Sequence, residues 1–142
     1  MSSLVGDLWP ADLVKVLPIS PMSIMEEQAI RLGGKTGELV QPDVRPEILG
    51  NYVELEFELV MPLFENYRYS IIKVSHPVNC YFPIHMFILG ETVGGPIANE
   101  AEFVGHLRET LGSERVKNVI RTCVDMQSSQ SLPPSLPSGF AI

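Results

Sequence analysis

The sequence predicts an α+β domain. An antiparallel sheet of three to four strands in meander order is expected to carry an N-terminal helix and a C-terminal helical hairpin, all packed on one of its faces. Three observations predict it: apolar residues recur with a helical period early in the chain, with a period of two in the middle, and with a helical period again afterwards. Apolar periodicity is the main local signal of secondary structure, and strands joined by short connections are usually neighbours in a sheet.

The first helix is predicted to begin near Ser23, because Ser23 and Glu26 have the spacing of a capping box. Gly33 and Gly34 are predicted to end it, since glycine readily adopts the left-handed conformation found after helices. Residues 1–20 precede this helix and are more apolar than a free tail should be. We therefore expect this lead-in segment to dock on the domain or on a partner.

The strict alternation of apolar and polar residues over positions 52–59 is the clearest pattern in the chain. It predicts an antiparallel strand with one buried and one solvated face, and the helices are expected to cover the buried face. The apolar side carries Val53, Leu55, Phe57 and Leu59, and the other side carries Glu54, Glu56 and Glu58.

Further strands are predicted on both sides of this one. A first strand is expected within residues 37–44 and a turn at 46–50, and a second long strand at 67–76 follows a five-residue connection. The run at 80–89 is rich in aromatic and β-branched residues but contains Pro83. Because proline cannot donate to a strand ladder, this run is predicted to be an edge strand or a bulged one.

Two helices are predicted after the strands. Asn99 and Glu102 form a second capping box, and Gly112 separates this helix from the next one, which Ser113 is expected to cap. The short connection makes the two helices a hairpin. Residues 128–142 are rich in serine and proline and carry no charge, which predicts a loose tail.

Composition narrows the classes of function. The 142 residues suffice for one domain, expected at residues 21–127, and the net charge of −7 disfavours nucleic acid and anionic membranes as partners. No secretory signal is apparent, and no apolar run approaches the roughly 20 residues of a transmembrane helix. The two cysteines form no CxxC pair, and the expectation is a cytoplasmic protein without a cofactor.

The region around His76, Cys80 and His85 is one place where the sequence suggests catalysis or metal binding. A cysteine and two histidines on neighbouring strands are suitable zinc ligands, and a cysteine beside a histidine is a potential nucleophile with its base. Against a zinc site, strand parity places His85 on the opposite face from Cys80 unless Pro83 creates a bulge. Against a nucleophile, the residues around Cys80 match no catalytic signature. No fourth ligand is evident, so no metal site is assigned.

Two sets of residues are predicted to bind a partner. The row of Glu54, Glu56 and Glu58 suits a basic partner, a hard cation or acid–base chemistry, although a solvated sheet face, whose glutamates pair with Arg68 or Lys73, is the simpler explanation. The second set is Leu63 and Phe64, at the tip of a connection, with Tyr67 beside them. Turns favour small polar residues, so these apolar side chains either fold back over the core or form a contact site.

The sequence therefore favours a non-catalytic protein-interaction domain, either self-associating as a homodimer or acting as an acidic adaptor or chaperone-like protein. The apolar lead-in, the pair Leu63 and Phe64, the expected edge strand and the acidic row all point to contacts with protein. The alternative is a small metal-dependent or cysteine-based enzyme that uses the region of His76, Cys80 and His85.

Overall fold

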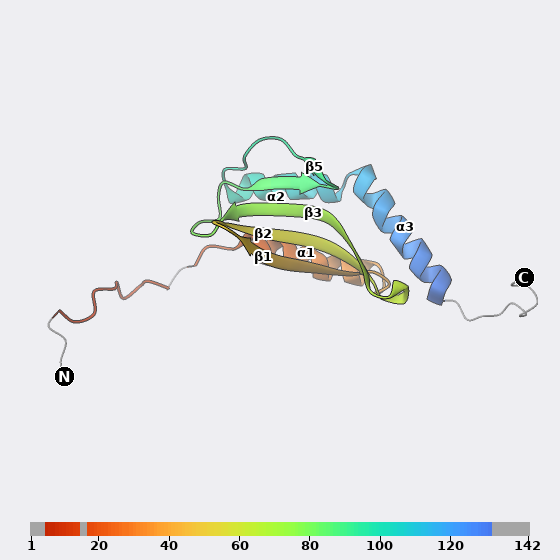
Figure 1. The fold of residues 1–142 in the computed structure, drawn as a ribbon, viewed down its shortest axis with the longest axis horizontal. Coiled ribbons are helices and arrows are strands. Elements are labelled where there is room, and N and C mark those ends of the chain that lie inside the picture. Colours follow the sequence, from red (N-terminus) through yellow and green to blue (C-terminus); the bar gives the residue numbers. More distant parts are fainter. Residues whose placement is uncertain (1–4, 15–16, 132–142) are drawn as a thin grey trace, which may run out of the picture.

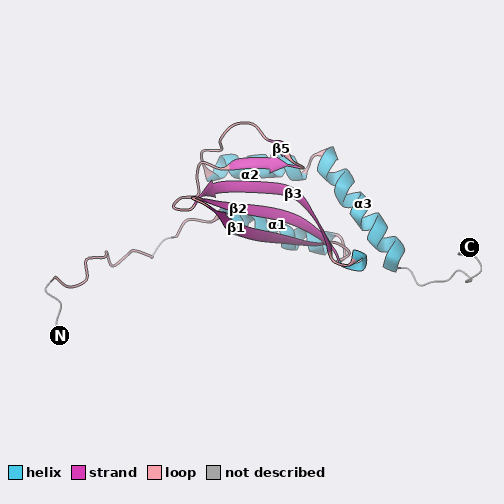
Figure 2. Ribbon diagram, viewed as in Figure 1, coloured by secondary structure: helices cyan, strands magenta, loops and turns pink. Residues whose placement is uncertain are grey.

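A five-stranded antiparallel sheet with helices on one face forms the body of the computed structural model, which describes residues 5–14 and 17–131 (Figures 1 and 2). The α+β class and the meander order β1-β2-β3-β4-β5 are confirmed, with five strands in place of three or four. The elements are α1 (Pro21–Lys35), β1 (Gln41–Leu49), β2 (Tyr52–Met61), the 3-10 helix η1 (Pro62–Phe64), β3 (Tyr67–Pro77), β4 (His85–Ile88), β5 (Glu91–Thr92), α2 (Glu100–Leu111) and α3 (Glu114–Ser131).

The core lies between the sheet and the helices. Alternate residues of β2 point toward the helices, as the alternation predicts, and the buried set includes Leu55, Phe57 and Leu59 from this strand. In Figure 1, α1 and α2 lie behind the sheet, and α3 runs past the end at which β3 begins. Met25 of α1 and Phe103 of α2 are fully buried against the sheet side chains.

A β-bulge shapes the pairing of the two central strands. Phe57 of β2 pairs with Ile72 of β3, but the next residue, Glu58, pairs with Ser70, so that Ile71 is an extra residue on β3. The bulge resets the alternation of β3, so that Tyr69 before it and Ile72 after it both pair with inward-facing residues of β2. Bulges also increase the local twist of a strand.

The start and end of α1 differ from the prediction. The helix begins at Pro21, and its N-cap is Ser20, whose hydroxyl oxygen accepts the backbone N–H of Ser23 at 3.0 Å. Proline is well tolerated in the first helical turn, where its missing N–H has no helical partner. The helix also continues past Gly33 and Gly34, and the left-handed residues that follow it are Gly37 and Glu38.

The first strand also differs from the prediction. It extends to Leu49 through Pro42 and Pro46, and the chain turns at Gly50 instead of over residues 46–50. The physical reason is the position of β1 at the edge of the sheet, since no other described strand pairs with its outer side. Prolines are compatible with an edge strand because their missing N–H groups need no partner there.

The prediction of an edge strand over residues 80–89 is wrong. Only His85–Ile88 form a strand, and β4 lies between β3 and β5. Pro83 precedes the strand and belongs to the connection that follows β3, so its missing N–H does not interrupt a ladder. The strand β5 has two residues, which is too short to produce a recognisable alternation.

The two predicted C-terminal helices are present, with a two-residue connection, but they do not form the predicted hairpin, because α3 turns away from α2 and runs past the end of the sheet (Figure 1). Asn99 caps α2 by accepting the N–H of Glu102 at 2.9 Å, and the hydroxyl of Ser113 accepts the N–H of Val116 at the start of α3. Helix α3 continues to Ser131, past the position at which the tail was predicted to begin. Residues 132–142 of that predicted tail lie outside the described residues.

None of the helices in the described ranges combines the length and the apolar character that crossing a bilayer requires.

Candidate functional site

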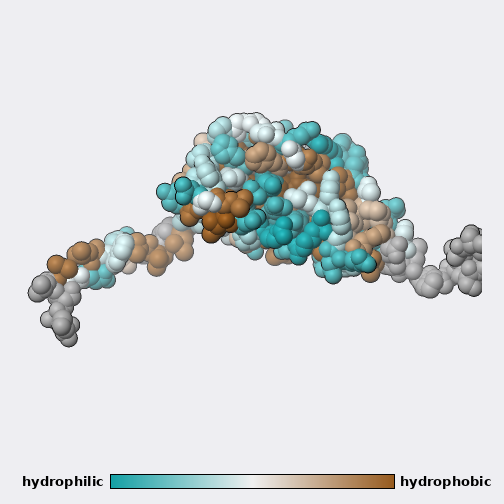
Figure 3. All heavy atoms as spheres, viewed as in Figure 1, coloured by the Kyte–Doolittle hydropathy of each residue, from teal (hydrophilic) through white to brown (hydrophobic). Residues whose placement is uncertain are grey.

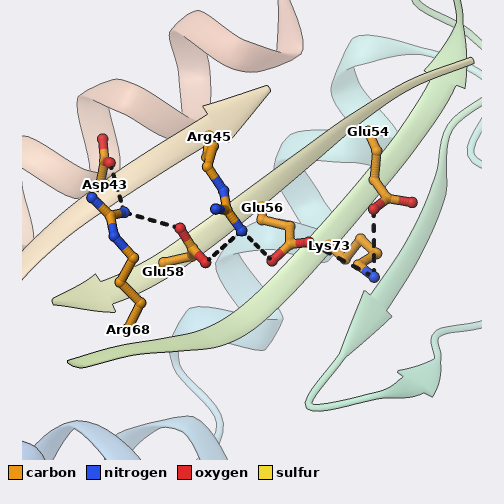
Figure 4. A network of polar contacts seen from close by, with 7 residues as sticks. All are labelled: Asp43, Arg45, Glu54, Glu56, Glu58, Arg68 and Lys73. Atoms are coloured by element: carbon orange, nitrogen blue, oxygen red, sulfur yellow. Dashed lines mark hydrogen bonds and ion pairs between the residues drawn. The ribbon is translucent and has the colours of Figure 1, made fainter. Parts of the chain in front are cut away.

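The glutamate row lies on the face of the sheet that the helices leave open, and its carboxylates have cationic partners from both neighbouring strands (Figure 4). Glu58 is only 4% exposed, although it lies on this open face. Arg45 of β1 donates to one of its oxygens at 3.2 Å, and Arg68 of β3 donates to the other at 3.1 Å. The two guanidinium groups therefore cover the carboxylate and replace its water.

The remaining members of the row belong to the same network. Lys73 lies between Glu54 and Glu56, with nitrogen–oxygen distances of 3.5 and 3.9 Å, and Arg45 also approaches Glu56 at 3.9 Å. Arg68 donates in addition to Asp43 at 3.0 Å. This charge ladder consists of Asp43, Arg45, Glu54, Glu56, Glu58, Arg68 and Lys73.

The charge ladder is nearly balanced, because its four carboxylates face three cations. The hydrogen bond to Asp43, followed by the one to Glu58, raises the pKa of Arg68, so this side chain stays charged. Figure 3 shows hydrophilic residues gathered over the middle of this face. A basic partner would have to displace these internal cations before it could bind the glutamates.

The hydrogen bonds of His76 and Cys80 go to backbone carbonyls. The Nδ1 of the buried His76 lies 2.7 Å from the carbonyl oxygen of Pro77 and 3.2 Å from that of Cys80, so this nitrogen carries the proton. The ring also stacks edge-on against Tyr81, with centroids 5.4 Å apart. The exposed Cys80 thiol donates to the carbonyl of Phe82 at 3.2 Å.

His85 lies apart from His76 and Cys80. It pairs with Ser75 and is exposed on the outer face, whereas His76 is buried. Cys80 lies in the connection between β3 and β4, so the predicted strand parity does not apply to it. Within residues 5–14 and 17–131, no three histidine, cysteine, aspartate or glutamate side chains lie close enough together to hold a metal ion.

The predicted contact residues of the β2–β3 connection lie at one end of the sheet, next to α3. Phe64 packs against the core, in agreement with the folding-back alternative, while Leu63 remains 48% exposed and Tyr67 56% exposed. These residues lie apart from the glutamate row, so the two predicted sets of partner-binding residues do not form one surface. Tyr67 lies on the helix side of the sheet and pairs with Met61.

Gln127 holds the end of α3 in place, and nothing in the sequence analysis singled it out. Its side chain is 1% exposed, its amide oxygen accepts the N–H of Leu63 at 3.1 Å, and its amide nitrogen donates to the carbonyl of Leu39 at 2.6 Å. One buried amide thus joins α3 to η1 and to the connection before β1. The feature of the sequence that could have identified Gln127 is its position, because it is a polar residue four positions after Cys123 on the buried stripe of this helix.

An apolar groove of about 430 Å³ separates the beginning of β3 from α3. None of its lining side chains is a carboxylate or a basic group, and burial raises the pKa of its one thiol, Cys123. The lining residues are Met61, Tyr67, Tyr69, Asn118, Val119, Thr122, Cys123 and Met126. We call this feature the β3–α3 groove.

The β3–α3 groove borders an open strand edge. Among the described strands, β4 pairs only with residues 72–75 of β3, so residues 67–70 have β2 as their single neighbouring strand. Figure 1 shows α3 descending past this part of β3. The site therefore combines apolar side chains with backbone groups that lack a second strand.

The lead-in segment exposes an unusual amount of apolar surface. Figure 3 shows brown, hydrophobic side chains along the segment, which extends away from the sheet. We call its residues 5–19 the arm. Seven large apolar side chains of the arm are 55–81% exposed: Val5, Leu8, Trp9, Leu13, Val14, Leu17 and Ile19.

Comparisons of this chain with protein-family models, with curated proteins and with solved structures find no match.

Proposed function

We propose that this chain is a non-catalytic protein-interaction domain that binds an apolar polypeptide segment in the β3–α3 groove. The observation that carries the proposal is the groove itself, in which uncharged side chains lie beside the open edge of β3. Exposed apolar patches with this character typically mark contact sites for protein. Leu63 and Tyr67, the predicted contact residues, lie at the groove or next to it.

The geometry suits an extended segment. A bound strand beside residues 67–70 would pair with the free backbone groups of β3, as in other complexes formed by strand addition. Every second side chain of that segment would then point toward Tyr69 and Met126 in the groove. Main-chain pairing gives affinity in this mode, and the side-chain pockets give specificity.

The contacts of the candidate catalytic residues also favour binding over catalysis. His76 and Cys80 both direct their hydrogen bonds to backbone carbonyls, an arrangement that stabilises the β3–β4 connection. An activated cysteine needs an adjacent base or a positive environment. Both cysteines are free thiols, which fits the proposed location in the reducing cytoplasm.

Photo-cross-linking tests the proposal. A benzophenone amino acid in place of Tyr67 or Tyr69, in the full chain expressed in cells, is expected to form a covalent adduct with a polypeptide. Tyr52 is the matched control, because it is a tyrosine of similar exposure at the other end of β2. The adduct should disappear in a Met126→Glu background. Equal adducts from position 52, or none from positions 67 and 69, would contradict the proposal.

A further inference from the structure

We infer that the occupant of the β3–α3 groove is the arm of a second copy of this chain, so that two copies exchange their arms in a symmetric dimer. This inference rests on the proposed function and names the partner. Both halves of the contact are present on each chain: an apolar groove, and an apolar segment whose large side chains are mostly exposed. In a two-fold dimer, each surface would then be used twice.

Chemical complementarity is the first argument. The arm carries Trp9 at 72% exposure and Leu8 at 81%, and the groove offers two tyrosines, two methionines and a valine. Tryptophan is among the residues that most often dominate binding energy at interfaces. Methionine-lined surfaces adapt well to such side chains, because the thioether chain is flexible and polarisable.

The area available is the second argument. Burial of an aliphatic or aromatic side chain removes roughly 60–120 Å² of apolar surface from water. Because alternate side chains of a paired strand face the groove, about four of the seven would be buried, which gives about 240–480 Å² per arm and about 1,000–1,900 Å² for two arms with the surfaces they cover. That range covers the area of specific protein–protein interfaces.

The reach of the arm is the third argument, and it favours a second copy over the same chain for the stretch from Leu13 onward, which is the stretch suited to strand addition. Leu17, Pro18 and Ile19 lie beside residues 78–82, which follow the end of β3, whereas the groove lies where β3 begins. The 11 residues of β3 separate these two places by about 33 Å. The chain from Leu13 to Ser20 spans at most about 25 Å, so the later part of the arm cannot reach its own groove.

The sequence of the arm fits strand addition. Residues 11–17 contain no proline and lie between Pro10 and Pro18, so each of them has a backbone N–H that can donate in a strand ladder once the turn that the N–H of Leu13 closes on the carbonyl of Pro10 opens. Two of the apolar residues in this stretch, Leu13 and Val14, are 55% and 71% exposed in the single chain. Paired with residues 67–70 of the other copy, this stretch would extend that copy's sheet beyond β3.

Sedimentation equilibrium of the full chain and of three variants tests the inference. The wild type is expected to be a dimer. The arm variant Leu8→Ser/Trp9→Ser and the groove variant Met126→Glu are each expected to weaken dimerisation at least about tenfold, with unchanged circular dichroism. Ile30→Ser is the matched control, since Ile30 is an apolar residue of α1 with 77% exposure, outside both surfaces.

A mixture of the two variants distinguishes arm exchange from other dimers. The arm variant keeps an intact groove and the groove variant keeps an intact arm, so one arm–groove contact can form between them. The mixture should therefore reach a higher average mass than either variant alone. Contact between two arms, or between two grooves, would give no such recovery and would overturn the inference.

Two outcomes separate the inference from the proposed function. A monomeric wild type, or an arm variant that remains as dimeric as the wild type, overturns arm exchange. If cross-linking from Tyr69 to another polypeptide persists in that case, the groove still binds protein and only the identity of the partner is wrong. If the cross-link is absent as well, both statements fail.

Discussion

The open face of the sheet and the β3–α3 groove differ in whether their side chains have partners within the chain. On the open face, Glu58 is almost inaccessible, yet both of its oxygens accept from arginines of the same chain. In the groove and along the arm, large apolar side chains such as Trp9 and Tyr67 stay exposed to water. The comparison teaches that the charges of the open face are paired within the chain, whereas the apolar side chains of the groove and the arm are not covered, and this difference is why we propose the apolar surfaces as the contact sites.

The difference arises from strand register. Glu56 of β2 pairs directly with Arg45 of β1 and with Lys73 of β3. Glu58 pairs with Asp43 of β1, and its two arginine partners lie at neighbouring positions of β1 and β3. Opposite charges in such positions are close neighbours on one face of a sheet. The groove has no equivalent, because β4 ends before it reaches residues 67–70.

The largest effect on stability is expected from Gln127→Leu, which removes the buried amide that joins α3 to η1. The substitution leaves the N–H of Leu63 and the carbonyl of Leu39 without their partner, which is expected to lower the free energy of unfolding by about 1–3 kcal/mol. Chemical denaturation measures the change. Gln28→Leu on α1 is the control, and equal effects of the two substitutions would show that the Gln127 contacts contribute nothing particular.

A smaller loss of stability is expected from Glu58→Gln, which removes one negative charge from the charge ladder. Removal of the negative charge leaves Arg45 and Arg68 with weaker partners, and we expect a loss of about 1–2 kcal/mol in unfolding free energy. Glu47→Gln, at an exposed position of β1, should change it by less than about 0.5 kcal/mol. Dimerisation should be unaffected by both, and a Glu58→Gln protein that dissociates would refute the contrast between the two surfaces.

The reactivity of the two thiols tests how far the groove side of α3 is shielded from solvent, and it needs no substitution. Cys80 is exposed, whereas burial raises the pKa of Cys123 at the groove and keeps it in the unreactive thiol form. With an alkylating agent at neutral pH, Cys123 is expected to react more than about tenfold more slowly than Cys80. Intact-mass spectrometry of timed samples measures this, and similar rates would mean that the groove side of α3 is open to solvent.

The smallest effect concerns pH and the start of α3. The hydrogen bond from Lys117 lowers the pKa of Glu114, so the contribution of this contact to stability is complete above the unfolded pKa of about 4.3. It is lost as pH falls through the lowered pKa of the folded state. Thermal unfolding of Glu114→Gln should therefore depend slightly less on pH in this acidic range than wild type or Glu109→Gln. A steeper dependence would contradict the assignment.

Local signals in the sequence predicted the parts of the fold that depend on neighbouring residues. The alternation over 52–59 predicted β2 and its buried face, and the capping box at Asn99 predicted the start of α2. The extent of β1 could not be predicted, because its prolines are acceptable only at a sheet edge. The same holds for the strand predicted at 80–89, in which Pro83 turned out to precede β4.

The candidate site was predictable only in part. Leu63 and Phe64 were named because apolar residues at a connection are unusual, and Tyr67 because it lies beside them. Tyr69, Met126 and Gln127 belong to the same region through the packing of α3 beside β3, a contact between residues more than 50 positions apart. No local pattern carries that information. The docking of the lead-in segment stays a prediction.

Hydrogen exchange followed by mass spectrometry, at low and high protein concentration, tests the central contrast most directly. The account predicts that protection rises with concentration in the arm, in residues 67–70 and in the part of α3 that lines the groove, while β1 and the glutamate-bearing part of β2 remain unchanged. Protection that appears instead on β1 and β2 would place the interface on the open face of the sheet, and it would contradict the account.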